Sequence, residues 1–247
     1  MTLLIFSQSI FAEEETLYQN SLKFFKTGDY TQAISNLNEL HKLGKESFES
    51  RYLAGHAHWK KGDYPSAIEE WQISKKIQPR NLNVTLDLIK AHSFVGQTRT
   101  AFLICREALR KFPESRDLKL SYSSLLIKVK RVRQALEIIE SLKAENSNDY
   151  RSLALESKIY FDMGNFEKAE TSIKWALALS PENPNLLNNL ALILERLADS
   201  KIAENNKDGA KKNLEEAKKQ LEIALKKENR EVFANNLKRI GDSLNAL

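Results

Sequence analysis

Cysteine, glycine and proline are all scarce in this chain of 247 residues. The single cysteine, Cys105, excludes an internal disulfide and a zinc site built from several cysteines. Eight glycines and five prolines are too few for the many turns of a β-sandwich, whereas abundant Leu, Ala, Lys and Glu favour helices. No apolar run approaches the roughly 20 residues of a membrane-spanning helix. The composition therefore indicates an all-α protein, and its hydrophobic fraction of 42% is enough for a core.

Charge of one sign is not concentrated anywhere in the sequence. The chain has 38 basic and 33 acidic side chains, which gives a net charge of +5, and no block of five like charges occurs. A dedicated nucleic-acid binder usually has a concentrated basic face. The even mixture instead indicates solvated helix surfaces.

Motifs of catalysis and cofactor binding are also missing. The sequence has no glycine-rich phosphate loop, no G-x-S-x-G elbow and no H-E-x-x-H pair. His56 and His58 lie two residues apart, so on a helix they point in different directions and cannot share a metal ion. Cys105 occupies an interior helix position, which is typical of a buried structural thiol. We predict no catalytic residue, no metal ligand, no cofactor and no enzymatic activity. A non-catalytic subunit that recruits substrate to an enzyme complex is compatible with this prediction.

The N-terminal residues 1–12 read MTLLIFSQSIFA and are followed by three glutamates. An apolar stretch that ends in a small residue is typical of the end of a signal peptide, here with cleavage after Ala12. This interpretation predicts an exported, periplasmic protein whose mature chain, residues 13–247, begins at Glu13. The alternative is an apolar N-terminus of a cytoplasmic protein.

Internal repetition is what the sequence has in abundance, because four kinds of residue recur with a period of 34. The alanines of this period are Ala33, Ala67, Ala101, Ala135 and Ala169. The glycines are Gly28, Gly62, Gly96 and Gly164, with Lys130 in the missing place. The prolines are Pro79, Pro113 and Pro181, and the short polar residues are Ser47, Asn81, Ser115, Asp149 and Asn183.

Each of these four residue types has a physical role in a pair of helices. Glycine allows the positive φ of a turn after the first helix, and the alanine methyl allows two helix backbones to approach closely. Proline ends the second helix, because the residue before it is disfavoured in the α region. Ser, Asn or Asp supplies an N-cap oxygen for the next helix.

This pattern resembles the tetratricopeptide repeat (TPR), a helix–turn–helix of 34 residues with a small residue at repeat position 8, Gly at 15, an aromatic at 17, Ala at 20 and Pro at 32. We place five repeats at residues 14–47, 48–81, 82–115, 116–149 and 150–183. The resemblance implies a right-handed superhelical solenoid in which the first helix of each repeat lines a concave groove.

An irregular sixth repeat, residues 184–230, follows. Leucines recur at helical spacing from Leu187 to Leu197 and again from Leu214 to Leu221, and aligning Ala217 with the other alanines needs about 14 extra residues between these helices. We therefore expect a longer first helix and a turn at Asn205–Gly209. The amphipathic stretch 231–246 predicts a capping helix, since the last repeat would otherwise expose an apolar face.

Repeat positions 2, 5, 9, 12 and 13 line the groove in the TPR family. Carried over to this sequence, the resemblance gives a set of candidate partner-binding residues that is rich in aromatics and lysines. They are Tyr18, Phe25, Lys26, Tyr52, His56, Trp59, Lys60, Lys90, Phe94, Lys128, Arg151, Lys158 and Phe161. Aromatic side chains are favoured as binding anchors, and lysines attract carboxylates.

The leading interpretation is a non-catalytic scaffold that binds a protein segment with apolar and acidic character in this groove. If residues 1–12 are an export signal, the scaffold belongs to a bacterial-type envelope or secretion-related assembly. A cytosolic adaptor or regulator that uses the same groove is the alternative. A third reading, less favoured because acidic residues such as Glu49 and Asp117 would repel phosphate, is binding of single-stranded nucleic acid by the lysines and aromatics.

Overall fold

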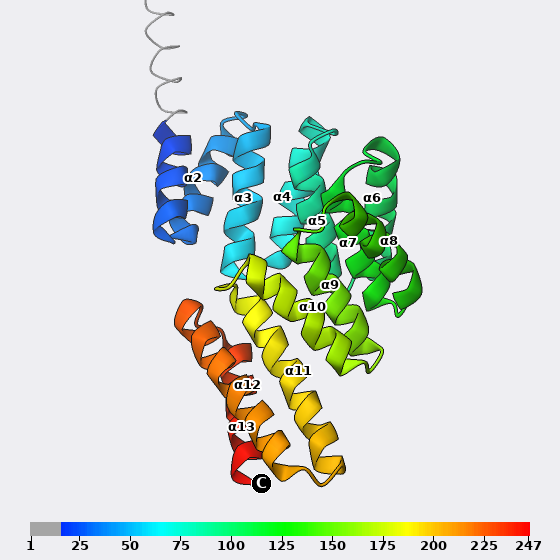
Figure 1. Ribbon diagram of the computed structural model, residues 1–247. Helices are drawn as coiled ribbons and strands as arrows, with labels where there is room; N and C mark the ends of the chain where they lie inside the picture. Colours follow the sequence, from blue (N-terminus) through cyan, green and yellow to red (C-terminus); the bar gives the residue numbers. More distant parts are fainter. Residues whose placement is uncertain (1–15) are drawn as a thin grey trace, which may run out of the picture. The chain divides into compact units, whose positions relative to one another are not determined.

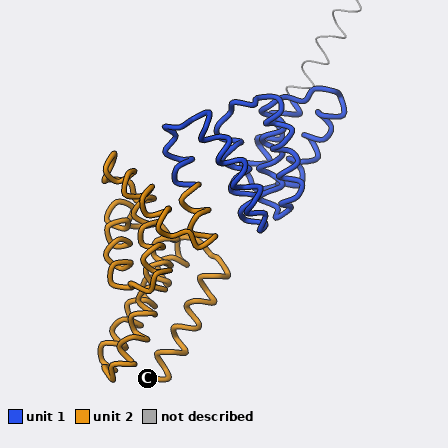
Figure 2. Tube along the Cα trace, turned by 90° about the vertical axis from the view of Figure 1, so that its right-hand side faces the viewer, with its two compact units in different colours: residues 1–121 blue, residues 122–247 orange. Residues whose placement is uncertain are grey.

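The computed structural model describes residues 16–247, and all regular secondary structure in this range is α-helical (Figure 1). This confirms the predicted all-α class. The stretch 1–12, for which we predict an export signal, lies outside the described residues. The described chain divides into two compact units, residues 16–121 and residues 122–247, and the boundary lies within the helix α7 (Arg116–Lys128) (Figure 2). We call them unit 1 and unit 2.

Consecutive helices pack against one another as pairs in both units. In unit 1 the helical residues 16–27 are followed by α2 (Tyr30–Lys42), α3 (Phe48–Lys61), α4 (Tyr64–Ile77), α5 (Leu82–Phe94), α6 (Thr98–Lys111) and the first part of α7 (Arg116–Lys128). Unit 2 continues with α8 (Val132–Glu145), α9 (Tyr150–Asp162), α10 (Phe166–Leu179), α11 (Pro184–Ala203), α12 (Lys207–Lys227) and α13 (Glu231–Asn245). None of these helices is both long enough and apolar enough to cross a bilayer.

The repeated residues have the local roles that their chemistry predicts. The side chains of Ser47, Asn81, Asp149 and Asn183 each accept a hydrogen bond from a backbone N–H in the first turn of the following helix. All five periodic alanines are fully buried where helices meet. The two helices of each pair can therefore approach closely, as we predicted.

The periodic glycines all have positive φ, between 76° and 85°. Lys130 stands in the fourth of these places and takes the same left-handed conformation, with a φ of 63°. The geometry of the turn is thus preserved where the glycine is lost, at the cost of placing a Cβ in a conformation that L-residues disfavour.

The irregular sixth helix pair packs side by side with α13 at the end of the chain (Figure 1). The turn lies at Glu204–Asn206, slightly earlier than predicted, because Asn206 caps α12 by accepting a hydrogen bond from the N–H of Gly209 at 2.9 Å. Gly209 therefore belongs to α12, and a Cβ at this position would clash with the Asn206 side chain. Phe233 and Ile240 of α13 are buried in the same core as Leu194.

Candidate protein-interaction surface

Four ring-bearing side chains follow one another along a single face of α3. Phe48 stacks on Tyr52 with ring centroids 5.3 Å apart, and Tyr52 meets His56 edge to face at 4.5 Å. Trp59 continues the series one turn later. Residues three and four apart on a helix are neighbours, so the spacing 4, 4, 3 produces this row.

Trp71 of α4 supports this row from the core side. Its side chain is only 2% exposed, and its indole N–H donates to the carbonyl of Tyr52 at 3.3 Å. The ring also contacts His56 and Trp59, at centroid distances of 5.2 and 5.8 Å. It lies directly over Gly55, where a Cβ would come within 2.4 Å of the indole. The absence of a side chain at Gly55 therefore fixes the position of Trp71 and of the row above it.

Asp87 of α5 faces the same row from the next repeat. Its carboxylate accepts a hydrogen bond of 2.5 Å from the Tyr52 hydroxyl and lies 3.5 Å from His56 Nε2. Burial and the bond to Asp87 raise the pKa of Tyr52. Burial lowers the pKa of His56, and the positive charges of Lys90 and Lys60 lower it further against the opposing effect of Asp87. Both rings are therefore neutral at neutral pH, and Asp87 is already engaged.

The row ends in a compact group of three rings, Trp59, Tyr64 and Phe94, which we call the aromatic platform. Their centroids lie 4.7–5.2 Å apart with interplanar angles of 60–65°, so each ring meets the other two edge to face. These distances leave no space between the rings for a ligand. Phe94, at the end of α5, nevertheless remains 60% exposed.

Two lysines, Lys90 and Lys60, lie beside the aromatic platform. Lys90 lies over the Trp59 ring at 5.7 Å, and the pKa of His56 responds to both Lys90 and Lys60. Lys26 is a third exposed lysine on the first helices of unit 1. None of these three ammonium groups has a carboxylate partner among residues 16–247. The platform is thus an apolar surface with uncompensated positive charge at its side.

Two predicted groove aromatics of the first repeat are packing residues instead of free surface. Tyr18 and Phe25 pack against the buried cluster of Leu37, Leu53 and Ala54. Phe25 also meets Tyr30 edge to face at 5.5 Å. The same pairing of repeat positions 12 and 17 recurs at Trp59 with Tyr64 and at Phe161 with Phe166. An aromatic side chain at position 12 therefore stabilises its own helix pair first.

The predicted residues of the second half, Lys128, Arg151, Lys158 and Phe161, do not gather into a comparable surface. Lys128 and Arg151 are exposed near the start of the unit, and Arg151 pairs with Asp149 at 3.3 Å. Lys158 pairs with Asp162 at 3.0 Å and lies over Phe161 at 5.9 Å.

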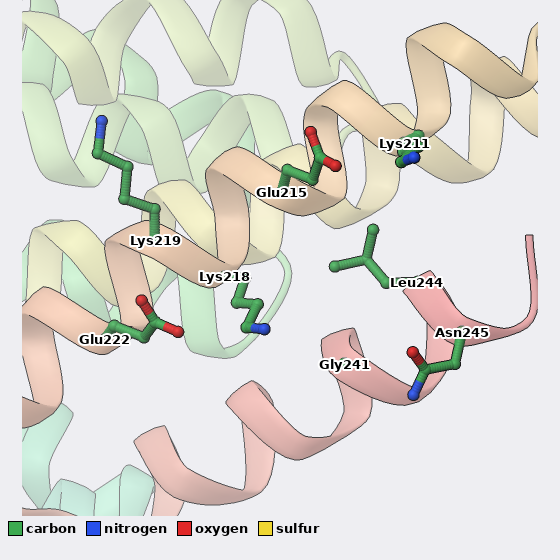
Figure 3. Close-up of a pocket in the computed structure, with 8 residues that line it drawn as sticks. All are labelled: Lys211, Glu215, Lys218, Lys219, Glu222, Gly241, Leu244 and Asn245. Atoms are coloured by element: carbon green, nitrogen blue, oxygen red, sulfur yellow. The ribbon is translucent and has the colours of Figure 1, made fainter.

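Several hollows open on the described surface. One, of about 500 Å³, lies between α12 and α13 (Figure 3). In Figure 3, Lys218 points from α12 toward α13, and Leu244 points back toward Lys211 and Glu215. The walls of this hollow carry both lysines and glutamates, and these polar groups do not converge on one point. Such a mixture is typical of a solvated helix surface. A second, of about 390 Å³, lies beside Pro79 and Phe112, and a third, of about 180 Å³, lies between α9 and α11.

The remaining chemically capable side chains serve the structure. Burial raises the pKa of the Cys105 thiol to about 12, so the sulfur stays protonated and unreactive. His58 and His92 occupy the same repeat position and close the turn after their helices through Asp63 (3.0 Å) and Gln97 (2.6 Å). Residues 16–247 contain no cluster of three or more His, Cys, Asp or Glu side chains suited to a metal ion.

Two family models, both described as tetratricopeptide repeat, match the chain. One covers residues 95–159, and the other covers residues 18–73 and 155–204. Together they include more than half of the sequence. The chain belongs to the tetratricopeptide repeat family. Proteins of this family are in general protein-interaction scaffolds, and no curated protein matches this TPR chain in sequence.

Solved TPR structures share the fold at low sequence identity. A TPR protein from Parabacteroides merdae is 15% identical, with a TM-score of 0.64 over 93% of this chain and 99% of that chain. Human IFIT1, solved as a dimer with m7Gppp-AAAA, is 20% identical, with a TM-score of 0.68 over 91% of this chain and 55% of its own. MamA from Desulfovibrio magneticus is 15% identical, with a TM-score of 0.52 over 74% of this chain and 97% of its own.

Sequence reasoning missed two side chains that shape these surfaces, Asp87 and Asn189. Both occupy repeat position 6, which lies outside the five positions that we carried over from the family. Asp87 receives the Tyr52 hydroxyl, and Asn189 lines the hollow between α9 and α11. One sequence signal could have identified both residues. Each is a polar residue on the side of its first helix that faces the first helix of the preceding repeat.

Proposed function

We propose that this protein is a non-catalytic scaffold whose unit 1 binds a partner segment on the aromatic platform. The segment carries an apolar anchor, which packs on Phe94, and acidic side chains, which pair with Lys60 and Lys90. The observation that carries this proposal is Phe94, 60% exposed yet held by Trp59 and Tyr64, beside lysines that have no carboxylate partner in the described chain.

Physical arguments favour a protein segment as the ligand. Rigid aromatic side chains lose little conformational entropy on binding, and they are enriched among residues that dominate interface energies. A large exposed aromatic beside polar residues marks an interaction site more often than an isolated exposed side chain does. Uncompensated lysines favour acidic partners over neutral ones and speed the encounter.

The proposed setting is a bacterial-type envelope or secretion-related assembly, and this part rests on residues 1–12 alone. A cytosolic adaptor would use the same platform. The mass of the protein isolated from its native host distinguishes the two, because export predicts a mature chain that starts at Glu13. An intact N-terminus would favour the cytosolic adaptor.

Single-stranded nucleic acid is the competing ligand for a surface of lysines and aromatics. Asp87 adds negative charge beside His56, which opposes phosphate. Human IFIT1 shares the fold, but at 20% sequence identity this similarity supports the fold alone and not the same ligand. Nucleic acid would be favoured over a protein ligand if the protein captured nuclease-sensitive material and if the amount captured fell steeply as the salt concentration rose.

The proposal is tested by affinity capture from fractionated host cells, followed by mass spectrometry. Phe94→Ala and the double change Lys60→Glu/Lys90→Glu alter exposed side chains, whereas Trp59→Ala would also disturb the core. Trp175→Ala is the matched control, because Trp175 is 64% exposed on α10 of unit 2. We expect one partner to be retained by the wild type and the control and lost from both unit 1 variants. A partner retained by all four proteins would refute the platform as the binding site.

A further inference from the structure

The hollow between α9 and α11 has the size of one side chain. Its volume is about 180 Å³. Sites for drug-sized molecules occupy roughly 300–1,000 Å³, and a water molecule in liquid takes about 30 Å³. Its lining residues all belong to unit 2 and are Ser157, Lys158, Phe161, Asn189, Leu192 and Ile193. A cofactor is therefore too large for this hollow, whereas a single amino-acid side chain fits.

The walls of the hollow are mostly apolar, and contacts within unit 2 hold them in place. Phe161 is held edge to face by Phe166 at 5.5 Å, and Ile193 belongs to the buried core of unit 2. The Ser157 hydroxyl donates to the carbonyl of Ala169 at 2.7 Å, so it presents no free donor to the hollow. A preformed apolar wall binds an aliphatic group with little reorganisation.

Asn189 contributes the one uncommitted polar group at this site. Its side chain is half-buried, and its amide has no hydrogen bond to any other described residue. The adjacent Asn188, in contrast, accepts a hydrogen bond of 2.8 Å from the Asn236 amide. A carboxamide offers both a donor and an acceptor, which match the C=O and N–H of a peptide group. Asn189 is therefore suited to hold the backbone of an extended segment.

Lys158, the charged side chain that lines the hollow, is already paired with Asp162 at 3.0 Å. Arg196, which lies one turn along α11 from Leu192 and outside the lining, pairs with Asp199 at 3.4 Å. An acidic ligand would have to compete with these intramolecular carboxylates. The electrostatic balance thus favours an uncharged ligand here, unlike the lysines near Phe94.

We infer that this hollow is a second binding site, which takes one aliphatic side chain from an extended, uncharged partner segment. The side chain packs on Phe161, Leu192 and Ile193, and the flanking peptide group exchanges hydrogen bonds with the Asn189 amide. The site uses residues of unit 2 alone and does not depend on ligand binding at the aromatic platform.

The test uses N-acetyl-leucine N-methylamide, a leucine side chain between two peptide groups. The full-length protein, labelled with ¹³C at Leu and Ile methyls, is titrated and followed by NMR. We expect saturable shifts of the Leu192 and Ile193 methyl signals, with a dissociation constant of about 1 mM for so small a ligand. N-acetyl-alanine N-methylamide should bind about tenfold more weakly or worse, because it lacks the buried methylenes. N-acetyl-leucinate, which carries a free carboxylate, should bind no more tightly than the amide.

Asn189→Ala should weaken binding of the leucine amide about tenfold. Asn235→Ala removes an exposed amide from α13, outside the hollow, and should leave the affinity unchanged. Unmoved Leu192 and Ile193 signals, or equal binding of the leucine and alanine amides, would overturn the side-chain site. Tighter binding of N-acetyl-leucinate would make it an anion site instead. If Asn189→Ala bound the leucine amide as tightly as the wild type does, the proposed hydrogen bonds between Asn189 and the peptide group would be refuted. The three probes test the hollow on the wild-type protein even if this variant fails to fold.

Discussion

The first helices of the repeats carry similar residue types in unit 1 and unit 2, but the surroundings of those residues differ. Position 12 is aromatic at both Trp59 and Phe161, and a lysine stands at position 9 as Lys90 and Lys158. Lys158 is paired with Asp162 one turn later, whereas Lys90 is followed one turn later by Phe94. The charge of the lysine is thus cancelled in unit 2 and left uncompensated in unit 1.

At repeat position 6 the difference is reversed, because here the side chain of unit 1 has partners and that of unit 2 has none among the described residues. Asp87 in unit 1 is engaged by Tyr52 and His56, whereas Asn189 in unit 2 has no partner in the described chain. Within the described residues, unit 1 therefore offers lysines without a carboxylate partner and an aromatic surface, and unit 2 offers an amide without a partner beside an aliphatic hollow. Differences at repeat positions 6 and 13 are enough to give one fold two different chemical preferences.

Repeat position 8 gives the sharpest contrast in stability. Gly55→Ala places a methyl within 2.4 Å of the buried Trp71 ring, which has no room to move. We expect a loss of about 3 kcal/mol in the free energy of unfolding, at the upper end of the range for overpacked cores. Ser157→Ala, at the same position in unit 2, removes only the hydrogen bond to Ala169 and should cost about 1 kcal/mol. Urea unfolding of the two variants measures both, and equal losses would contradict the assigned role of Gly55.

All four histidines lie in unit 1, so acid should affect the two units unequally. Burial, assisted by the charge of Arg51, lowers the pKa of His41 from 6.5 to about 4. Because the unfolded chain then binds a proton that the folded chain does not, stability is complete above pH 6.5 and is lost as the pH falls toward 4. After allowance for partial exposure, the loss from His41 is about 2 kcal/mol.

Tryptophan fluorescence reports this loss. In the Trp175→Phe chain, Trp59 and Trp71 follow unit 1 alone. Urea unfolding at pH 7 and pH 4.5 should show a smaller loss of stability in His41→Leu than in the protein with His41, since Leu cannot take up a proton. An identical pH dependence in the two proteins would exclude His41 as a source of acid sensitivity.

The fold could be predicted closely from the sequence because its determinants are local and periodic. An N-cap, a turn glycine and a buried alanine act within a few residues, and the period of 34 repeats each of them. Even the loss of glycine at Lys130 did not mislead, since the backbone keeps the same left-handed turn. The turn before α12 was misplaced slightly because Gly209 was taken as a turn residue, whereas its role is to make room for the Asn206 cap.

The surfaces were harder to predict because they depend on contacts between repeats. The sequence identified Trp59, Phe94 and Lys90 as candidates, but not that Tyr18 and Phe25 pack into the core of unit 1. Whether a lysine has a carboxylate partner depends on side-chain positions on neighbouring turns and helices, which a family pattern does not contain. Asn189 was missed for the same reason.

The smallest effect concerns His56 and tests the uncompensated lysines directly. Lys90 and Lys60 both lower the pKa of His56, so Lys60→Ala/Lys90→Ala should raise it. Asp87→Asn should lower it further, because the carboxylate is the neighbour that favours the protonated ring. Lys158→Ala, which removes a paired lysine from unit 2, should leave it unchanged. A pH titration of the His56 ring protons by NMR measures all three. If removing Lys60 and Lys90 left this pKa unaltered, their charges would be screened by solvent at the platform, and attraction of an acidic partner would lose its physical basis.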